Sequence, residues 1–274
     1  MKNYNQSPLP FQGQKRRFLG EFKKALKDVP EEAIFVDLFG GSGLLSHTVK
    51  CERPGAKVVY NDFDNFSERI AAIPKTNALL KEIRFLTKDC IPDKRIDNEI
   101  KARVLTLLHN QRGFVDYITL SASLLFSGKY ATNYEEIAKE TFYNTVKQSD
   151  YVADGYLQGV ERICVDYKKA FAEYKNNKNV VFLIDPPYLS TDAKSYKSYW
   201  KLRDYLDVLD TLQTGNYFYF TSNKSQLIEL CNWFANRTAY ASPFSGSTMV
   251  SVAGSVNFNA QYEDIMLYKI KQNE

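Results

Sequence analysis

Apolar positions along the chain follow two spacings, one typical of helices and one typical of buried strands. Phe18, Phe22, Leu26 and Val29 recur every three or four residues, which predicts a helix over residues 16–29. Helical spacing returns after residue 44 and over residues 199–212. Short continuous apolar runs predict buried strands at 33–36, 57–60, 162–165, 180–184 and 217–220. This alternation of strands and helices predicts an α/β fold built from βαβ units.

The middle of the chain has a different pattern. Apolar residues between about 66 and 160 repeat with helical spacing, but no run resembles a buried strand. We therefore expect a mostly helical domain over residues 70–155, inserted into an α/β domain that comprises residues 1–69 and 156–274. Two alternating segments near the end, 249–258 and 265–270, predict an antiparallel pair of strands.

Composition narrows the class of protein. The chain has 274 residues, of which 44% are hydrophobic, and this apolar content argues against a disordered or collagen-like chain. The longest clean apolar run, 180–184, is far shorter than the roughly 20 residues of a membrane-spanning helix. Residues 1–8 contain no apolar block of the kind found in secretory signals. We expect no membrane partner.

Cysteine, histidine and charge add three expectations. The four cysteines are isolated and only two histidines accompany them, so we expect no metal site, reduced thiols and a cytoplasmic protein. The net charge is +4, and residues 1–30 carry seven basic and two acidic side chains. This basic segment either attracts phosphates or forms a solvated helix face, and charge alone does not decide between them.

A glycine turn at residues 39–43 follows one predicted strand, and Asp62 ends the next. Glycines allow positive φ and close approach of a ligand, and a carboxylate after the second strand can accept the ribose hydroxyls of a nucleoside. Ser46 stands where a dinucleotide fingerprint has its third glycine, which disfavours a nicotinamide dehydrogenase. The turn is either a tight connection or, as the position of Asp62 favours, part of a nucleoside cofactor site.

The tetrapeptide Asp185-Pro186-Pro187-Tyr188 directly follows the predicted strand at 180–184. Ligands of open α/β sheets bind at the ends of such strands, and two prolines make the peptide rigid. The Asp185 carboxylate and the Pro186 carbonyl can each accept one hydrogen from a planar amino group, while Tyr188 offers a flat face for a heterocycle. The alternative is a stiff turn with a capping aspartate.

Together, these motifs resemble those of the S-adenosylmethionine-dependent N6-adenine DNA methyltransferases. Residues 10–15 resemble the segment before the glycine turn in the Dam-like (D12 class) group, and the order of motifs also fits. The resemblance implies a Rossmann-like methyltransferase fold, with the catalytic domain in 1–69 and 156–274 and an inserted target-recognition domain in 70–155. Residues 70–155 themselves carry no match.

The resemblance also implies roles for single residues. The cofactor would be S-adenosyl-L-methionine, with Lys15 on its methionine carboxylate, Asp62 on its ribose and Asp166 on its adenine amine. Lys15 as a surface charge and Asp166 as a helix N-cap remain alternatives. The full set of implied cofactor residues is Phe11, Gly13, Lys15, Asp37, Phe39, Gly41, Gly43, Asp62 and Asp166.

The implied catalytic residues are Asp185, Pro186, Pro187 and Tyr188, acting on an adenine flipped out of duplex DNA. Asp185 and the Pro186 carbonyl would draw the amine toward the methyl donor, and Tyr188 would stack on the base. Polar side chains on predicted loops are either DNA contacts or solvated positions. They are Asn110, Arg112, Tyr130, Asn133, Lys194 and Lys197.

We therefore interpret the sequence as a site-specific adenine DNA methyltransferase, orphan or from a restriction–modification system, encoded by a bacterium or phage. We expect duplex DNA as the partner and a monomer or weak dimer. An RNA N6-adenine methyltransferase and an inactive nucleic-acid-binding homologue are the alternatives.

Overall fold

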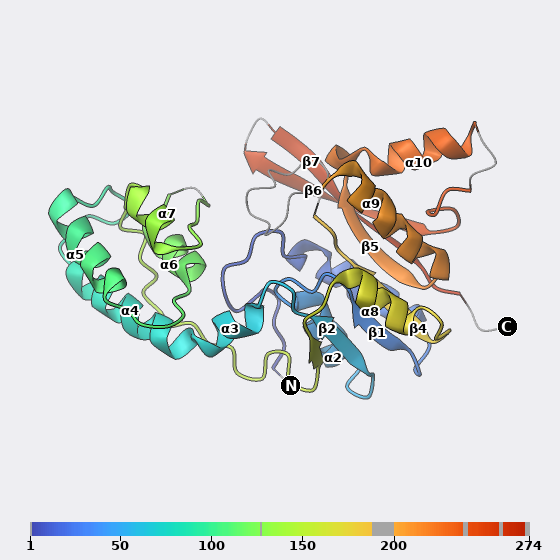
Figure 1. Cartoon of the computed structure of the whole chain (residues 1–274), viewed down its shortest axis with the longest axis horizontal. Helices are drawn as coiled ribbons and strands as arrows, with labels where there is room; N and C mark the ends of the chain where they lie inside the picture. Colours follow the sequence, from blue (N-terminus) through green and yellow to red (C-terminus); the bar gives the residue numbers. More distant parts are fainter. Residues whose placement is uncertain (1, 127, 188–199, 238–240, 258–259, 272–274) are drawn as a thin grey trace. The chain divides into compact units, whose positions relative to one another are not determined.

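A computed structural model describes residues 2–126, 128–187, 200–237, 241–257 and 260–271 of the chain (Figure 1). The chain forms two compact units. The first comprises residues 1–6, 13–64 and 155–274, and the second comprises residues 7–12 and 65–154. The short segment 7–12 therefore groups with the helical unit, although it precedes the glycine turn in sequence. No helix among the described residues is long and apolar enough to span a membrane.

The first unit is built on a seven-stranded sheet in the order β3-β2-β1-β4-β5-β7-β6. Strands β3, β2, β1, β4 and β5 are parallel, whereas β7 is antiparallel to both of its neighbours, β5 and β6. The strands are β1 (Ile34–Asp37), β2 (Val58–Asn61), β3 (Glu161–Ile163), β4 (Val180–Ile184), β5 (Tyr217–Ser222), β6 (Thr248–Asn257) and β7 (Ala260–Lys269).

Helices cover both faces of this sheet, and the core is divided accordingly. Phe35 and Val181 pack on one face with Phe22 of α1, and Val36 and Phe182 belong to the cluster on the other face. Successive residues of a strand point to opposite faces, so a strand covered on both sides needs a continuous apolar run. The elements are η1 (Arg16–Phe18), α1 (Leu19–Ala25), η2 (Leu26–Asp28), α2 (Leu44–Glu52), α8 (Tyr167–Tyr174), α9 (Leu202–Leu209), η4 (Asp210–Thr214), η5 (Asn223–Ser225) and α10 (Leu227–Ala235).

The second unit is helical and has its own apolar core. Leu80, Ile83, Val104, Leu120 and Phe142 are fully buried within it. Aspartate or asparagine side chains cap three of its helices by accepting backbone N–H bonds. Its helices are α3 (Phe66–Ala71), α4 (Ile73–Leu86), α5 (Asn98–His109), α6 (Tyr117–Leu124) and α7 (Tyr134–Lys139).

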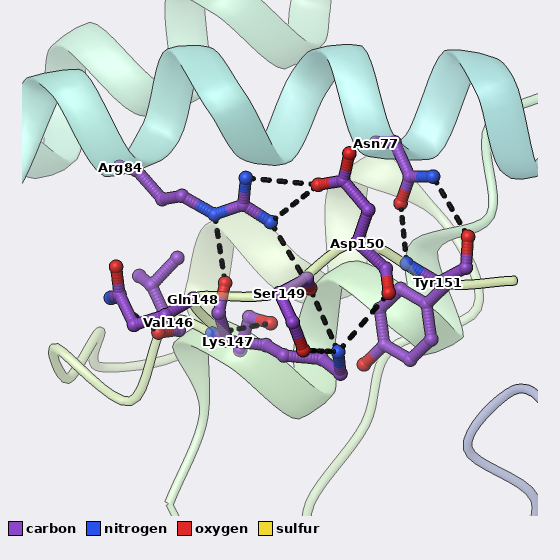
Figure 2. A network of polar contacts seen from close by, with 9 residues as sticks. Asn77, Arg84, Val146, Lys147, Gln148, Ser149, Asp150 and Tyr151 are labelled. Atoms are coloured by element: carbon purple, nitrogen blue, oxygen red, sulfur yellow. Dashed lines mark hydrogen bonds and ion pairs between the residues drawn. The ribbon is translucent and has the colours of Figure 1, made fainter.

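Two side chains of α4 hold the segment that leads out of the second unit (Figure 2). The Asn77 amide donates to the Tyr151 carbonyl and accepts from its N–H, both at 2.9 Å. Arg84 donates to the Lys147 and Ser149 carbonyls at 2.8 and 3.2 Å and to Asp150 Oδ1 at 3.0 Å. These bonds satisfy the backbone of a segment without regular secondary structure.

The predicted α/β architecture is confirmed, with local differences. The run at 180–184 is β4, and the alternating segments near the end form the antiparallel pair β6–β7. The helix predicted over 16–29 is a short α-helix between two 3-10 turns, because Pro30 follows closely and limits its length. Strand β3 ends at Ile163, earlier than predicted, because the chain turns there toward α8, which begins at Tyr167 and is capped by Asp166. The helix predicted over 199–212 is α9 followed by the 3-10 turn η4.

Candidate active site

The ends of two neighbouring strands bring the glycine turn and the Asp-Pro-Pro segment to one edge of the sheet. Strands β1 and β4 pair in parallel with Asp37 opposite Leu183, and Leu38 N–H donates to the Leu183 carbonyl at 3.0 Å. The strand order runs in opposite directions on either side of this pair. Ligands of open α/β sheets bind at such a switch point, beyond the carboxyl ends of the strands.

The glycine turn has a conformation that side chains would disrupt. Gly41 and Gly43 have φ of 51° and 74°, in the left-handed region that favours glycine. A Cβ on Gly40 would lie 2.2 Å from Cε2 of Tyr60 and 2.8 Å from the Asn61 carbonyl oxygen. The turn therefore packs tightly against β2.

Asp37, the last residue of β1, is a buried carboxylate with unequal oxygens. Oδ2 accepts a 2.7 Å hydrogen bond from Ser46, whereas Oδ1 has no partner in the described part of the chain. Burial raises the pKa of Asp37 to about 7, and the nearby Asp185 carboxylate adds to the rise, while hydrogen bonds from Ser46 and the Phe39 backbone and the charge of Lys15 oppose it. A buried acceptor without a donor is costly, so this oxygen is suited to a ligand that donates.

Asp62 is fully buried at the end of β2 and bonded to side chains from two strands. The Tyr60 hydroxyl lies 2.7 Å from the Gly41 carbonyl oxygen and 3.0 Å from Asp62 Oδ1, and these two acceptors share its single hydrogen. Arg162 of β3 donates to Asp62 Oδ2 at 2.7 Å, and about half of its side chain is exposed. Tyr60 therefore links the predicted ribose-binding carboxylate to the glycine turn.

Lys15 and Asp185 form an ion pair. Their Nζ and Oδ2 atoms are 2.6 Å apart, with 8% and 19% of the two side chains exposed. Lys15 also donates to the Gly13 carbonyl at 2.8 Å. Burial raises the pKa of Asp185 above its ordinary value, although the Lys15 charge and hydrogen bond lower it. Lys15 is thus a buried partner of Asp185 and not a solvated surface charge.

Aromatic rings lie beside the glycine turn. Phe39 is 4.8 Å from Tyr167 and 5.8 Å from Trp200, measured between ring centroids. Asp166 precedes Tyr167 and caps α8 by accepting from Lys168 N–H at 2.7 Å. Its capping role is therefore real, and a contact with the adenine amine of a cofactor stays a prediction.

The remaining predicted residues are spread over both units. Phe11 belongs to the second unit, where its ring packs edge-on against Phe66 at 5.7 Å. In that unit, the Tyr130 hydroxyl donates to Gln12, and Asn133 caps α7 by accepting from Glu136 N–H at 2.9 Å. Asn110 and Arg112 are exposed there. Pro186 is buried and Pro187 is partly buried in the first unit, and Tyr188, Lys194 and Lys197 lie outside the described residues.

Sequence reasoning missed several residues that support the site. Asn61 donates to the Leu38 and Val165 carbonyls at 3.0 and 2.9 Å, which ties the ends of three strands together. Tyr156 donates to the Ser42 carbonyl at 2.9 Å. Ser46 was visible in the sequence as the residue at the position of a fingerprint glycine, but nothing there paired it with Asp37. Tyr60, Asn61, Tyr156 and Arg162 carry no comparable signal, and each has a partner at least 19 residues away.

Comparisons with known proteins identify the family of this chain. A family model described as D12 class N6 adenine-specific DNA methyltransferase matches residues 11–215. A Haemophilus influenzae protein named "Putative methyltransferase" is 39% identical over 277 residues, covering 98% of this chain and 93% of the relative. These matches confirm the predicted family and its Rossmann-like methyltransferase fold. The chain belongs to the D12 class N6 adenine-specific DNA methyltransferase family.

Proposed function

We propose that this protein transfers a methyl group from S-adenosyl-L-methionine to the N6 amine of an adenine flipped out of duplex DNA. The observation that carries the proposal is the position of Asp185. Asp185 directly follows the last residue of β4, beside the glycine turn at the end of β1. Membership of the adenine-specific family supports the same reaction at a coarser level.

Asp185 and the Pro186 carbonyl are the proposed acceptors of the two N6 hydrogens. The amine lone pair is delocalised into the adenine ring, so acceptors that pull the nitrogen toward a tetrahedral geometry make it a better nucleophile. Prolines 186 and 187 restrict the backbone and keep the acceptors fixed. Rate enhancement then comes from positioning and from acceptors directed at the charge that develops on the amine.

The polar side chains around the glycine turn are suited to the proposed cofactor. S-adenosyl-L-methionine supplies an electrophilic methyl group when bound. Asp37 Oδ1, buried and without a partner among the described residues, is suited to an ammonium donor such as that of a methionyl group. We assign Lys15 to the methionyl carboxylate and Asp62 to the ribose hydroxyls. Arg162 is the donor that a ribose would replace, since about half of its side chain is exposed.

The target base and its surroundings are assigned by the same proposal. Extrusion of an adenine from a duplex costs a few kcal/mol, and stacking on Tyr188 would return part of that cost. We assign target recognition to the helical second unit, residues 7–12 and 65–154. Asn110 and Arg112 are its exposed candidates for DNA contact.

A transfer assay with tritiated methyl donor tests the proposal. We expect label in the N6 position of adenine in duplex DNA, little label in structured RNA, and a loss of at least about 100-fold on Asp185→Asn substitution, in line with removal of a single catalytic acceptor. Asp28→Asn, at an exposed position, is the matched control and should keep full activity. Preferential labelling of RNA would overturn the substrate, and an active Asp185→Asn variant would overturn the site.

A further inference from the structure

The ammonium group of Lys15 forms an ion pair with Asp185, the proposed catalytic carboxylate. Lys15 Nζ lies 2.6 Å from Asp185 Oδ2 and donates to the Gly13 carbonyl at 2.8 Å. The side chains of Lys15 and Asp185 are mostly buried, with 8% and 19% of their surfaces exposed to solvent. Water screens such a pair less than it screens a surface ion pair. Forming or breaking this pair therefore changes the free energy of the protein more than forming or breaking an exposed one.

The ion pair occupies the carboxylate that the reaction needs. A target amine approaching Asp185 must compete with an ammonium, and a charge-assisted hydrogen bond is roughly twice as strong as a neutral one. A free carboxylate elsewhere at the site would draw the ammonium away from Asp185. The carboxylate of the proposed methyl donor is such a group, so this step rests on the proposed function.

We propose that Lys15 is a positioning residue that couples the two substrates, because the donor's carboxylate competes with Asp185 for its ammonium and thereby releases Asp185 to accept the hydrogens of the target amine. Binding of the donor then favours binding of the base. By linkage, binding of the base favours binding of the donor by the same factor.

A binding cycle on the full-length protein tests this coupling. The probe is S-adenosylhomocysteine, measured by calorimetry, because its uncharged thioether removes any attraction between Asp185 and a sulfonium. Asp185→Asn should tighten binding about fivefold or more when Lys15 is present, since allosteric couplings are commonly of this size. In the Lys15→Met background, Asp185→Asn should change the affinity less than twofold. Equal tightening in both backgrounds would overturn the proposal.

Asp264→Asn is the matched control, because it removes a nearby negative charge without removing the direct partner of Lys15. Asp264 lies on β7 opposite Ser222, the last residue of β5, and interacts with Lys15 through its charge. Its neutralisation should change the affinity less than twofold, and tightening equal to that of Asp185→Asn would contradict competition for one ammonium. Should Lys15→Met fail to fold, Lys15→Gln completes the same cycle.

A second measurement needs no ligand. Carbon-13 NMR titration of the Asp185 carboxyl in the free protein should show a higher pKa after Lys15→Met, because Lys15 lowers that pKa in the wild-type protein. An unchanged pKa would overturn the ion pair on which the proposal stands. Failure of the wild-type protein to bind S-adenosylhomocysteine would instead overturn the proposed donor together with this coupling, which separates the two results.

Discussion

Ser46 donates a 2.7 Å hydrogen bond to Oδ2 of Asp37, and the other oxygen of this carboxylate has no partner in the described part of the chain. The serine stands at the position where a dinucleotide-binding turn has a glycine. Its hydroxyl therefore contributes to the site by stabilising a buried charge. The geometry leaves Oδ1 as the acceptor for a ligand at the end of β1.

The first prediction concerns the pH dependence of stability. The pKa of Asp37 rises from 3.8 to about 7 on burial, so the folded state holds a proton that the unfolded state has lost between these values. The contribution of Asp37 is therefore fully present below about pH 4, declines as the pH rises to about 7 and stays low above it. Asp37→Asn should remove this decline. Between pH 4 and pH 8, the unfolding free energy of the wild type should therefore fall by up to about 4 kcal/mol more than that of the variant.

Urea unfolding at pH 4, 6 and 8 checks this prediction. Ser46→Ala provides the matched comparison, because loss of its hydrogen bond should raise the pKa of Asp37 further, which extends the decline to higher pH and makes the total loss larger. Parallel stability profiles for wild type and Asp37→Asn would show that Asp37 ionises normally in the folded protein.

The second prediction concerns the hydroxyl of Tyr60. Tyr60→Phe removes the hydroxyl that the Gly41 carbonyl and Asp62 Oδ1 share, which should cost about 1–3 kcal/mol of unfolding free energy and weaken cofactor binding. Tyr217→Phe is the control, since this buried hydroxyl donates to the Pro243 carbonyl at 3.1 Å, away from the glycine turn. Its effect should be on stability alone. Equal cofactor affinities for the two variants, measured by calorimetry, would disprove the link between Tyr60 and the turn.

The third prediction concerns the packing of the glycine turn. Gly40→Ala should deform the turn, because its Cβ would lie 2.8 Å from the Asn61 carbonyl oxygen as well as 2.2 Å from the Tyr60 ring. A backbone atom cannot rotate away, so we expect a loss of about 2 kcal/mol or more in stability, as for other overpacked sites. Gly55→Ala, with nothing within 4 Å of its Cβ, should be tolerated. Thermal unfolding of both variants decides, and a Gly40→Ala variant as stable as wild type would refute the close packing.

The fourth prediction concerns the second unit. Arg69 donates to Asp116 at 3.0 Å and to the Pro10 carbonyl at 2.8 Å, and both charged side chains are buried. Arg69→Met leaves the Asp116 carboxylate buried without its cation, which should cost about 3–5 kcal/mol. Lys24→Met breaks an exposed pair with Glu21 and should cost less than about 1 kcal/mol. Similar chemical denaturation midpoints for the two variants would contradict this difference.

Local sequence patterns predicted much of the first unit, because burial of a strand or helix leaves a pattern of apolar residues within that segment. Strands β1 and β4 are covered on both faces, so each has a continuous apolar run that is visible without a structure. The helices α3, α6 and α7 have only six to eight residues, too few to show a clear helical period, so their individual positions did not stand out. Segment 7–12 packs with the second unit through partners that lie far away in sequence, which no local pattern indicates.

The sequence by itself determined the alternation of strands and helices, the glycine turn, the place of Asp185 after a buried strand and the family. The tertiary structure alone decided which side chains meet at the strand ends. It brought Lys15 to Asp185, Arg162 to Asp62 and Ser46 to Asp37. Strand order and register set these distances, and both result from contacts between segments far apart along the chain, whereas apolar periodicity records only how each segment is buried.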